Sequence, residues 1–548
     1  MKRASLVLVA AVCLSLAATL VAVGQDTATT EPSAGDLVLE AGDSIEPEAT
    51  EPAGEASGTD GAEPAEEPAA DETADEPDAS ISRTDEPAWG MPEEEDDEEI
   101  VLTADQRALY EEIGEQIDVE RMERGIRDLA SLGSRVSGTP GNLIAGTWVV
   151  DQFRSIGLED VRIEEFEVTV PVDHGTWVDL NGEEIRVYPL WPNLVRTCSV
   201  PTEGIGAALV DGGSGSLHDL SGRVIDSSIV LMDWTDDASW FNAPLLGARA
   251  VIFIEPELIS RGSAESKFLS VPADIPRFWI PREQGLALRE QLAQARAPEA
   301  RLFSDVRWES RTTFNVLGEI TGTENNPMPG HAEFPGSAQR IVLSAYYDSI
   351  SVVPDLAPGA ENAASIVTLL EIARVLKERP PRRSVLFLAT SGHFQSLYGI
   401  RDFFNRRFAA LVRPPEEVNT ILAAAGERPD TIGPMDVAAM FGIDVSSRND
   451  LVCAMYKGYF YDYVEDIQWK YSDYGSNSQD WARGIQKALG YPNTTYADAI
   501  NSITGRNWRS YLPGRLAMDF EEATVASRPA IGFCTGNDMR AYVDTPHD

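Results

Sequence analysis

Three side chains that could act as acids, bases or metal ligands lie near apolar runs in the middle of the chain. Asp348 follows the β-favouring run Ile341–Tyr347, and His393 follows a second apolar run, Ser384–Ala389. Glu361 lies between them, ahead of a helical pattern. In an open sheet of parallel strands, ligands bind beyond the carboxyl ends of the strands. We therefore expect Asp348, Glu361 and His393 to gather at one edge of such a sheet.

The elements that must position these side chains form a strand–helix–strand unit. Pro354, Pro358 and Gly359 break the chain after the first strand, and Arg382-Arg383 lead into the second. Between them, apolar side chains recur at helical spacing, at Ile366, Val367, Leu369, Leu370, Ala373 and Leu376. Such a unit is expected to pair its two strands in parallel through a right-handed crossover.

The same stretch resembles the zinc exopeptidase family of bacterial leucyl aminopeptidases, glutamate carboxypeptidase and transferrin-receptor-like proteins, the M28 type of peptidase. That family has His-x-Asp after its strand, then Gly-Ala-Asp-Asp-Asn, then a Glu-Glu pair before a Leu-x-Gly turn. The corresponding motifs here are Tyr346-Tyr347-Asp348, Gly359-Ala360-Glu361-Asn362 and His393-Phe394 before Leu397-Tyr398-Gly399. The resemblance covers about residues 103–548. It implies a three-layer α/β sandwich with a mostly parallel central sheet.

The resemblance also implies roles for the matching positions of a site that would hold two zinc ions. Tyr346 stands where the family has its first His ligand, and Asp348 matches the carboxylate that orients this imidazole. Glu361 matches the bridging carboxylate, while His393 and Phe394 replace the catalytic base and a ligand. A phenol ionises near pH 10, so Tyr346 is a poor zinc ligand at neutral pH.

Two later positions complete the comparison with the family's ligands. Asp444 matches a carboxylate ligand at the end of a strand, whereas Phe520 aligns with the last His ligand. The usual two-zinc site is therefore expected to be weak or absent. A rearranged metal site is the alternative, because carboxylates and one imidazole suit several divalent metals. Its candidate ligands are Glu361, His393, Asp444, Asp519 and Glu521. Zinc and no metal at all both stay open.

The formal charge of −45 is concentrated in one part of the chain. Residues 26–100 contain 27 Asp and Glu residues against a single basic residue, Arg83. This composition predicts a disordered acidic linker over residues 25–102, because it offers too little apolar surface to offset the entropy of ordering. An acidic chain without a basic stripe also argues against nucleic-acid binding.

The first 24 residues have the features of a secretory signal peptide. Lys2 and Arg3 precede an apolar run from Ala4 to Val23, and small residues surround the expected cleavage point at Gly24. We therefore expect an exported protein in the periplasm, at the cell surface or outside the cell. An uncleaved segment of this length would instead serve as an N-terminal membrane anchor.

The remaining sequence predicts a discontinuous core with an insert. Residues 103–170 and 312–548 correspond to the exopeptidase-like domain, and residues 171–311 form a β-rich insert that resembles the protease-associated domain. After cleavage of the signal, three cysteines remain, Cys198, Cys453 and Cys534. One disulfide is possible in an exported protein, but we expect buried thiols.

Three functions are compatible with these features. The leading hypothesis is a degenerate peptidase that binds peptide or protein ligands, because both imidazole ligands are replaced. The second is an active metal-dependent exopeptidase with a rearranged site and His393 as its base. The third is a cell-surface scaffold carried on the acidic segment.

Overall fold

The structure is a computed structural model that describes residues 103–294, 297–323, 340–412, 435, 437–455, 482–487, 489–492, 494–497, 516–526 and 528–548. The predicted signal peptide, residues 1–24, and the predicted acidic linker, residues 25–102, lie outside the described residues. All elements below belong to one compact unit of the chain.

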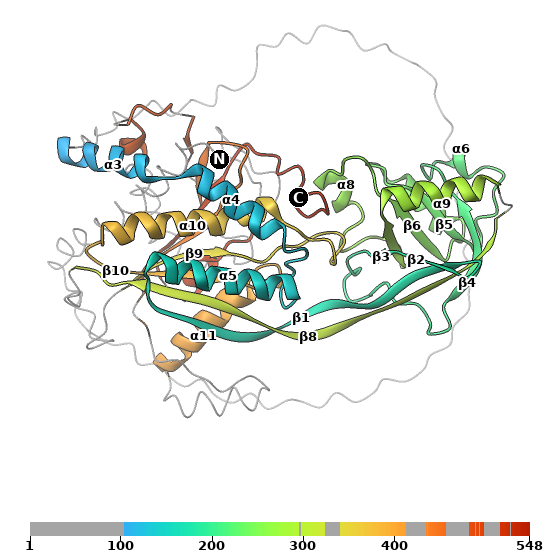
Figure 1. Ribbon diagram of the computed structural model, residues 1–548, viewed down its shortest axis with the longest axis horizontal. Helices are drawn as coiled ribbons and strands as arrows, with labels where there is room; N and C mark the ends of the chain where they lie inside the picture. Colours follow the sequence, from blue (N-terminus) through green and yellow to red (C-terminus); the bar gives the residue numbers. More distant parts are fainter. Residues whose placement is uncertain are drawn as a thin grey trace, which may run out of the picture. The chain divides into compact units, whose positions relative to one another are not determined.

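A single large β-sheet runs through the described part of the chain (Figure 1). The strands that carry the core half are β8 (Glu299–Ile320), β9 (Arg340–Tyr346), β10 (Ser384–Thr390), β11 (Val437–Asp444), β12 (Val452–Met455), β13 (Tyr496–Ala497) and β14 (Ala530–Thr535). Their order in the sheet is β13-β12-β14-β11-β9-β10-β8. The central strands β14, β11, β9 and β10 are parallel to their neighbours within this group.

The predicted strand–helix–strand unit is confirmed. Helix α10 (Ala360–Glu378) connects β9 to β10, and these two strands pair in parallel. The other helices of the core are α3 (Ala104–Gln116), α4 (Val119–Ala130), α5 (Pro140–Ile156), α11 (Tyr398–Val412) and α14 (Phe520–Val525). The first three begin with side-chain caps from Thr103, Asp118 and Thr139, which satisfy backbone N–H groups at the helix starts.

Alternating residues of the central strands contribute to two apolar clusters on opposite faces of the sheet. On β10, Val385 and Phe387 pack in the cluster that contains α10, whereas Leu386 and Leu388 pack in the cluster that contains α11 and α14. This alternation is the two-residue period of a strand with both faces buried. Helices therefore cover both faces, and the predicted α/β class with a mostly parallel central sheet is confirmed.

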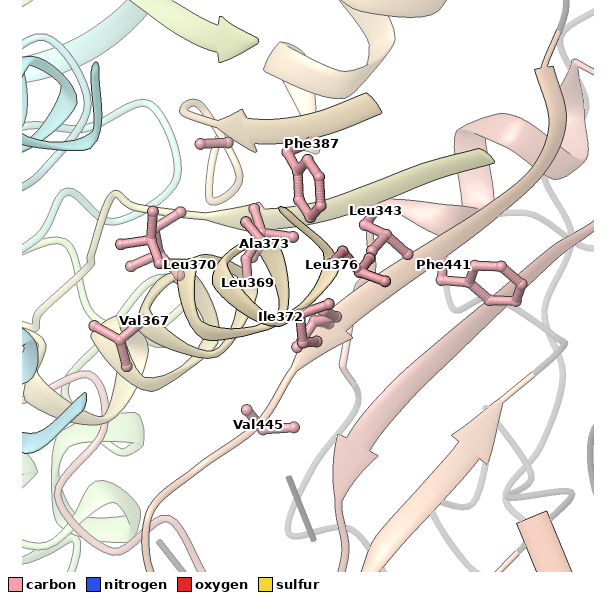
Figure 2. Close-up of a cluster of buried hydrophobic side chains, with 14 of the residues drawn as sticks. Leu343, Val367, Leu369, Leu370, Ile372, Ala373, Leu376, Phe387, Phe441 and Val445 are labelled. Atoms are coloured by element: carbon pink, nitrogen blue, oxygen red, sulfur yellow. The ribbon is translucent and has the colours of Figure 1, made fainter. Parts of the chain in front are cut away.

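Helix α10 supplies much of the first cluster. Figure 2 shows its side chains, among them Leu369 and Leu376, beside Phe387 of β10 and Phe441 of β11. Of its 19 residues, 14 are buried, so α10 is enclosed by the rest of the core around most of its circumference. Such burial fixes the position of the helix start, where Glu361 lies.

The region between β1 (Glu159–Leu180) and β8 adds further strands to the same sheet. Its elements are β2 (Glu183–Arg186), β3 (Tyr188–Pro189), β4 (Ile205–Asp211), α6 (Leu217–Leu220), β5 (Ile229–Asp233), η2 (Ser239–Phe241), α7 (Asn242–Leu245), β6 (Ala250–Ile254), α8 (Arg261–Glu265), β7 (Arg277–Ile280) and α9 (Arg282–Gln294). Strands β4 to β7 pair in parallel in chain order. The likeness of residues 171–311 to a protease-associated domain stays a prediction.

Strands β1 and β8 form a long antiparallel ribbon that continues through residues 171 and 311 (Figure 1). The paired register extends from Glu159 opposite Glu319 to Leu180 opposite Ala300, with two irregularities. The region of β4 to β7 is thus joined to the core by continuous strands.

Across the described residues, no helix combines the length and the apolar character needed to cross a bilayer.

Candidate functional site

Asp348 lies directly beyond the carboxyl end of β9 and is completely buried. Its Oδ2 atom accepts hydrogen bonds from the backbone N–H of His393 at 3.0 Å and from the Ser137 hydroxyl at 2.8 Å. Its Oδ1 atom has no hydrogen-bond partner. Burial raises the pKa of Asp348 to about 6. Asp348 thus links the loop after β10 to the loop before α5.

His393 follows β10 and is held from a second side by Asp519. The Nδ1 atom of His393 lies 3.2 Å from Oδ1 of Asp519, whose Oδ2 accepts a 2.8 Å hydrogen bond from Thr390. Burial alone would lower the pKa of His393, but the hydrogen bond and the charge of Asp519 raise it above its ordinary value. This pair resembles in geometry a base oriented by a carboxylate.

Tyr346, the last residue of β9, lies against the His393 ring. The two ring centroids are 3.9 Å apart, and Phe394 packs edge-on against both rings. The Tyr346 hydroxyl donates a 3.1 Å hydrogen bond to Oδ1 of Asp444. Burial, and then the Asp444 charge, raise the pKa of Tyr346 well above its ordinary value. The phenol is therefore neutral and acts as a hydrogen-bond donor.

Arg540 supplies a buried positive charge that the sequence analysis did not identify. Its Nη1 donates to Oδ1 of Asp444 at 2.8 Å, and its Nη2 donates to the Asp444 carbonyl oxygen at 2.9 Å. Both side chains are at most 5% exposed. The Asp444 carboxylate raises the pKa of Arg540 although burial opposes it. The only sequence signal was a basic residue shortly after the last predicted strand.

Glu361 lies at the start of α10 and has a different set of partners. Its two carboxylate oxygens accept 2.7 Å hydrogen bonds from the backbone N–H and the hydroxyl of Ser447. Arg448 lies 3.3 Å away, and the backbone N–H of Glu361 donates to Oδ1 of Asp548 at 3.0 Å. The structure joins Asp348 to His393, but it records no contact of Glu361 with either.

The two remaining candidates, Asp519 and Glu521, lie on either side of Phe520. Asp519 contacts His393, whereas Oε1 of Glu521 accepts the backbone N–H of Met518 at 3.0 Å. Phe520 is fully buried in the apolar cluster that contains α11. The position aligned with the last zinc ligand of the family therefore carries a side chain that packs in the core.

These residues do not fit a metal ion. Among the described residues, no three His, Cys, Asp or Glu side chains gather in an arrangement that could hold one. Asp444 is neutralised by Arg540, Glu361 is bound by Ser447, and Nδ1 of His393 faces Asp519. A zinc ion would have to compete with a guanidinium that is already bound at Asp444.

Comparison with known protein families gives a match over part of the core. Residues 329–442, which include β9, α10 and β10, match the model of peptidase family M28. Over these residues the chain is similar to the M28 peptidases. The resemblance inferred from the motifs around Asp348, Glu361 and His393 is thereby confirmed at the level of the family.

Several aminopeptidases are similar to this chain. The aminopeptidase YwaD of Bacillus subtilis (strain 168) is 25% identical over 282 residues, which are 49% of this chain and 53% of that protein. The chain thus spans about half the length of this relative. The structure of BSAP, a zinc aminopeptidase from Bacillus subtilis, has a TM-score of 0.46 at 18% identity over 79% of this chain and 89% of that chain. A peptidase M28 precursor from Shewanella amazonensis SB2B has a TM-score of 0.45 at 14% identity, covering 80% and 89%.

Proposed function

We propose that this protein is an exported member of peptidase family M28 that binds peptide or protein ligands without two-zinc hydrolysis. The Arg540–Asp444 ion pair is the observation that carries the proposal. A carboxylate that already holds a buried guanidinium would have to lose this partner before binding zinc. Breaking a buried pair costs about 3–5 kcal/mol.

The peptide or protein class of the ligand is supported by the relatives. YwaD and BSAP are named as aminopeptidases, and such enzymes act on peptides. At this edge of the sheet the half-buried Phe394 packs edge-on against the buried Tyr346 ring, so Phe394 offers apolar contact area where the family has a polar ligand. Export is proposed from the signal-like residues 1–24.

Metal analysis and peptide hydrolysis test the loss of zinc chemistry. Purified full-length protein, dialysed against metal-free buffer, is expected to retain no stoichiometric zinc by elemental analysis. Leucyl- and glutamyl-peptides are expected to be hydrolysed equally slowly after chelation and after zinc loading. Zinc that stays bound through dialysis, together with a zinc-dependent rate, would overturn the proposal.

Peptide binding is tested separately by equilibrium dialysis of a randomised tripeptide mixture, with mass spectrometry of the retained species. The wild-type protein should retain a subset of peptides, and Phe394→Ala should lose it. Arg307→Gln, which changes an exposed residue far along β8, is the matched control and should behave as wild type. Equal retention by all three proteins would contradict binding at this edge.

The second candidate is an active exopeptidase with altered chemistry, and the His393–Asp519 pair favours it. In that case His393→Ala would abolish a measurable peptidase rate, while Arg307→Gln would leave it unchanged. The third candidate, a cell-surface scaffold on an acidic stalk or a membrane-anchored form, predicts that partner capture is lost when residues 25–102 are deleted and unaffected by Phe394→Ala.

A further inference from the structure

Two of the three cysteines in the described residues lie directly opposite one another in the sheet. Cys453 of β12 and Cys534 of β14 are partners in the antiparallel register. Opposite residues of antiparallel strands have Cα atoms about 4.5 or 5.5 Å apart, and disulfides span Cα distances of about 4.4–6.8 Å. The backbone is therefore already placed for a bond between these residues.

The two side chains also point to the same face. Both are fully buried in the apolar cluster that contains α11 and α14. The Cys534 thiol donates a hydrogen bond of 3.7 Å to the Cys453 carbonyl oxygen, and the neighbouring Cys453 thiol, then burial, raise the pKa of Cys534 well above its ordinary value. The sulfur atoms are thus close neighbours in a dry environment.

Cys198 lies away from this pair. It is buried in the separate apolar cluster of β4 to β7, and its thiol donates to the Leu190 carbonyl oxygen at 3.5 Å. No other described cysteine belongs to that cluster. Cys198 is therefore an internal control for the chemistry of the pair.

We propose that Cys453 and Cys534 form a cross-strand disulfide between β12 and β14 when the chain folds in the presence of a low-molecular-weight disulfide. One cysteine thiolate attacks a sulfur of the small disulfide, which forms a mixed disulfide and releases one thiolate. The second cysteine attacks the protein sulfur of this intermediate, closes the bond and releases the second thiolate. The two cysteines are oxidised, the small disulfide is reduced to two thiols, and the two protons go to them.

The bond would lie next to the candidate site. Strand β14 lies between β12 and β11, and Cys534 is the parallel register partner of Asp444. Arg540 follows β14 by a few residues and holds Asp444. A disulfide from β14 to β12 would therefore hold in place the strand that immediately precedes Arg540 in the chain. The proposal does not depend on whether the site binds or hydrolyses peptides.

Thiol mapping tests the bond directly. The full-length protein is unfolded in urea and refolded with a mixture of oxidised and reduced glutathione. It is then alkylated with N-ethylmaleimide, digested and analysed by mass spectrometry without reduction. A linked peptide containing Cys453 and Cys534, with Cys198 alkylated, is expected. Alkylation of both Cys453 and Cys534, or a link from either to Cys198 or Cys13, would overturn the proposal.

Thermal unfolding gives an independent readout. In the refolded wild type and in Cys198→Ala, a reductant should lower the midpoint temperature by about 5 °C, because it opens a covalent loop of some 80 residues. Cys453→Ala and Cys534→Ala should lose this dependence on the reductant. An equal midpoint with and without reductant in the wild type would also contradict the bond.

Discussion

Arg540 and Asp444 bring a full positive charge and a full negative charge together in the interior of the core. Removing two charges from water is costly, and the cost is recovered only when each charge has a well-placed partner. Here the guanidinium donates one bond to the Asp444 carboxylate and one to the Asp444 carbonyl oxygen, and Tyr346 donates a second bond to the carboxylate. The charge that a cation would neutralise is balanced by the chain itself.

Replacing Arg540 should therefore destabilise the protein strongly. We expect Arg540→Met to lower the free energy of unfolding by about 3–5 kcal/mol, because Asp444 is left buried without compensation. Urea unfolding followed by circular dichroism measures the change. The exposed pair Arg307–Asp305 provides the control, where Arg307→Gln should cost at most about 1 kcal/mol. The double variant Arg540→Met, Asp444→Leu should recover most of the loss, and failure to recover would contradict the explanation.

Asp348 predicts a dependence of stability on pH. Its pKa is raised from 3.8 to about 6 by burial, so the folded state binds a proton more tightly than the unfolded state between these values. The contribution of Asp348 to the free energy of unfolding is then fully present below about pH 4 and is lost as the pH rises to about 6. Asp548, whose pKa burial raises from 3.8 to about 7, acts in the same direction between about pH 4 and pH 7, and the raised pKa of His393 does so at higher pH.

Asp348→Asn should flatten this profile. The rise of the Asp348 pKa from 3.8 to about 6 corresponds to about 3 kcal/mol. Between pH 4 and pH 6, the free energy of unfolding of the variant should therefore fall by up to about 3 kcal/mol less than that of the wild type. Urea unfolding at a series of pH values measures the slope. Asp128→Asn, at an exposed position of α4, should keep the wild-type slope. Parallel profiles of wild type and Asp348→Asn would show that Asp348 does not titrate in this range.

At the residue level, part of the site could be predicted from the sequence. The contacts that could not be predicted share a physical reason. Asp348 and His393 were expected together because they end neighbouring parallel strands, a rule that depends only on strand order. Arg540 was not found, since a surface-type residue in a terminal loop gives no periodic signal of burial. The Ser447 contact of Glu361 likewise depends on how two loops meet after folding.

At the scale of the elements, the start of α10 depends on one glycine. Gly359 caps the helix with φ +60°, and a Cβ atom there would lie 2.4 Å from the Ser349 side chain. Left-handed backbone and lack of space both demand glycine at this position. The helix start in turn places Glu361 and Asn362.

Gly359→Ala should consequently lower the free energy of unfolding by about 2–4 kcal/mol, from backbone strain and overlap together. Gly262→Ala in α8 is the matched control, because no atom lies within 4 Å of its added Cβ. The control should be neutral or slightly stabilising. Chemical unfolding of both variants distinguishes them, and equal stabilities would contradict the role of Gly359.

The elements themselves were largely predictable, with instructive differences at their ends. The apolar runs at β9 and β10 predicted their strands to within two residues, because both faces are buried and the runs are continuous. By contrast, the boundary expected after residue 170 falls inside β1, which extends without a break from Glu159 to Leu180. The length of β1 is set by its pairing with β8. The residue propensities of a single segment carry no information about such pairing.

At the scale of the whole described unit, the segment after β14 contacts the region of β4 to β7 as well as the core. Ala541 accepts a 2.7 Å hydrogen bond from the Arg261 backbone N–H, and the Arg261 side chain lies 3.3 Å from Asp544. His547 lies 2.8 Å from Glu255, while Asp548 caps the start of α10. One short segment therefore connects Asp444, Glu361 and helix α8.

Arg261→Gln should weaken this connection. Burial raises the pKa of Asp544, and loss of the Arg261 charge removes the main opposing influence. We expect a loss of about 1–3 kcal/mol in the free energy of unfolding and faster proteolysis within residues 536–548. Arg196→Gln, at an exposed ion pair with Asp274, should change neither quantity. Unchanged proteolysis in Arg261→Gln would contradict the connecting role.

The ribbon of β1 and β8 has a mechanical consequence. The two strands remain hydrogen-bonded to each other on both sides of residues 171 and 311. Bending at a single peptide bond would therefore break several of their hydrogen bonds at once, and this makes the ribbon stiff. Strand β8 also pairs with β10, whose next neighbour is β9, so the ribbon is hydrogen-bonded directly to the strands that position Asp348 and His393.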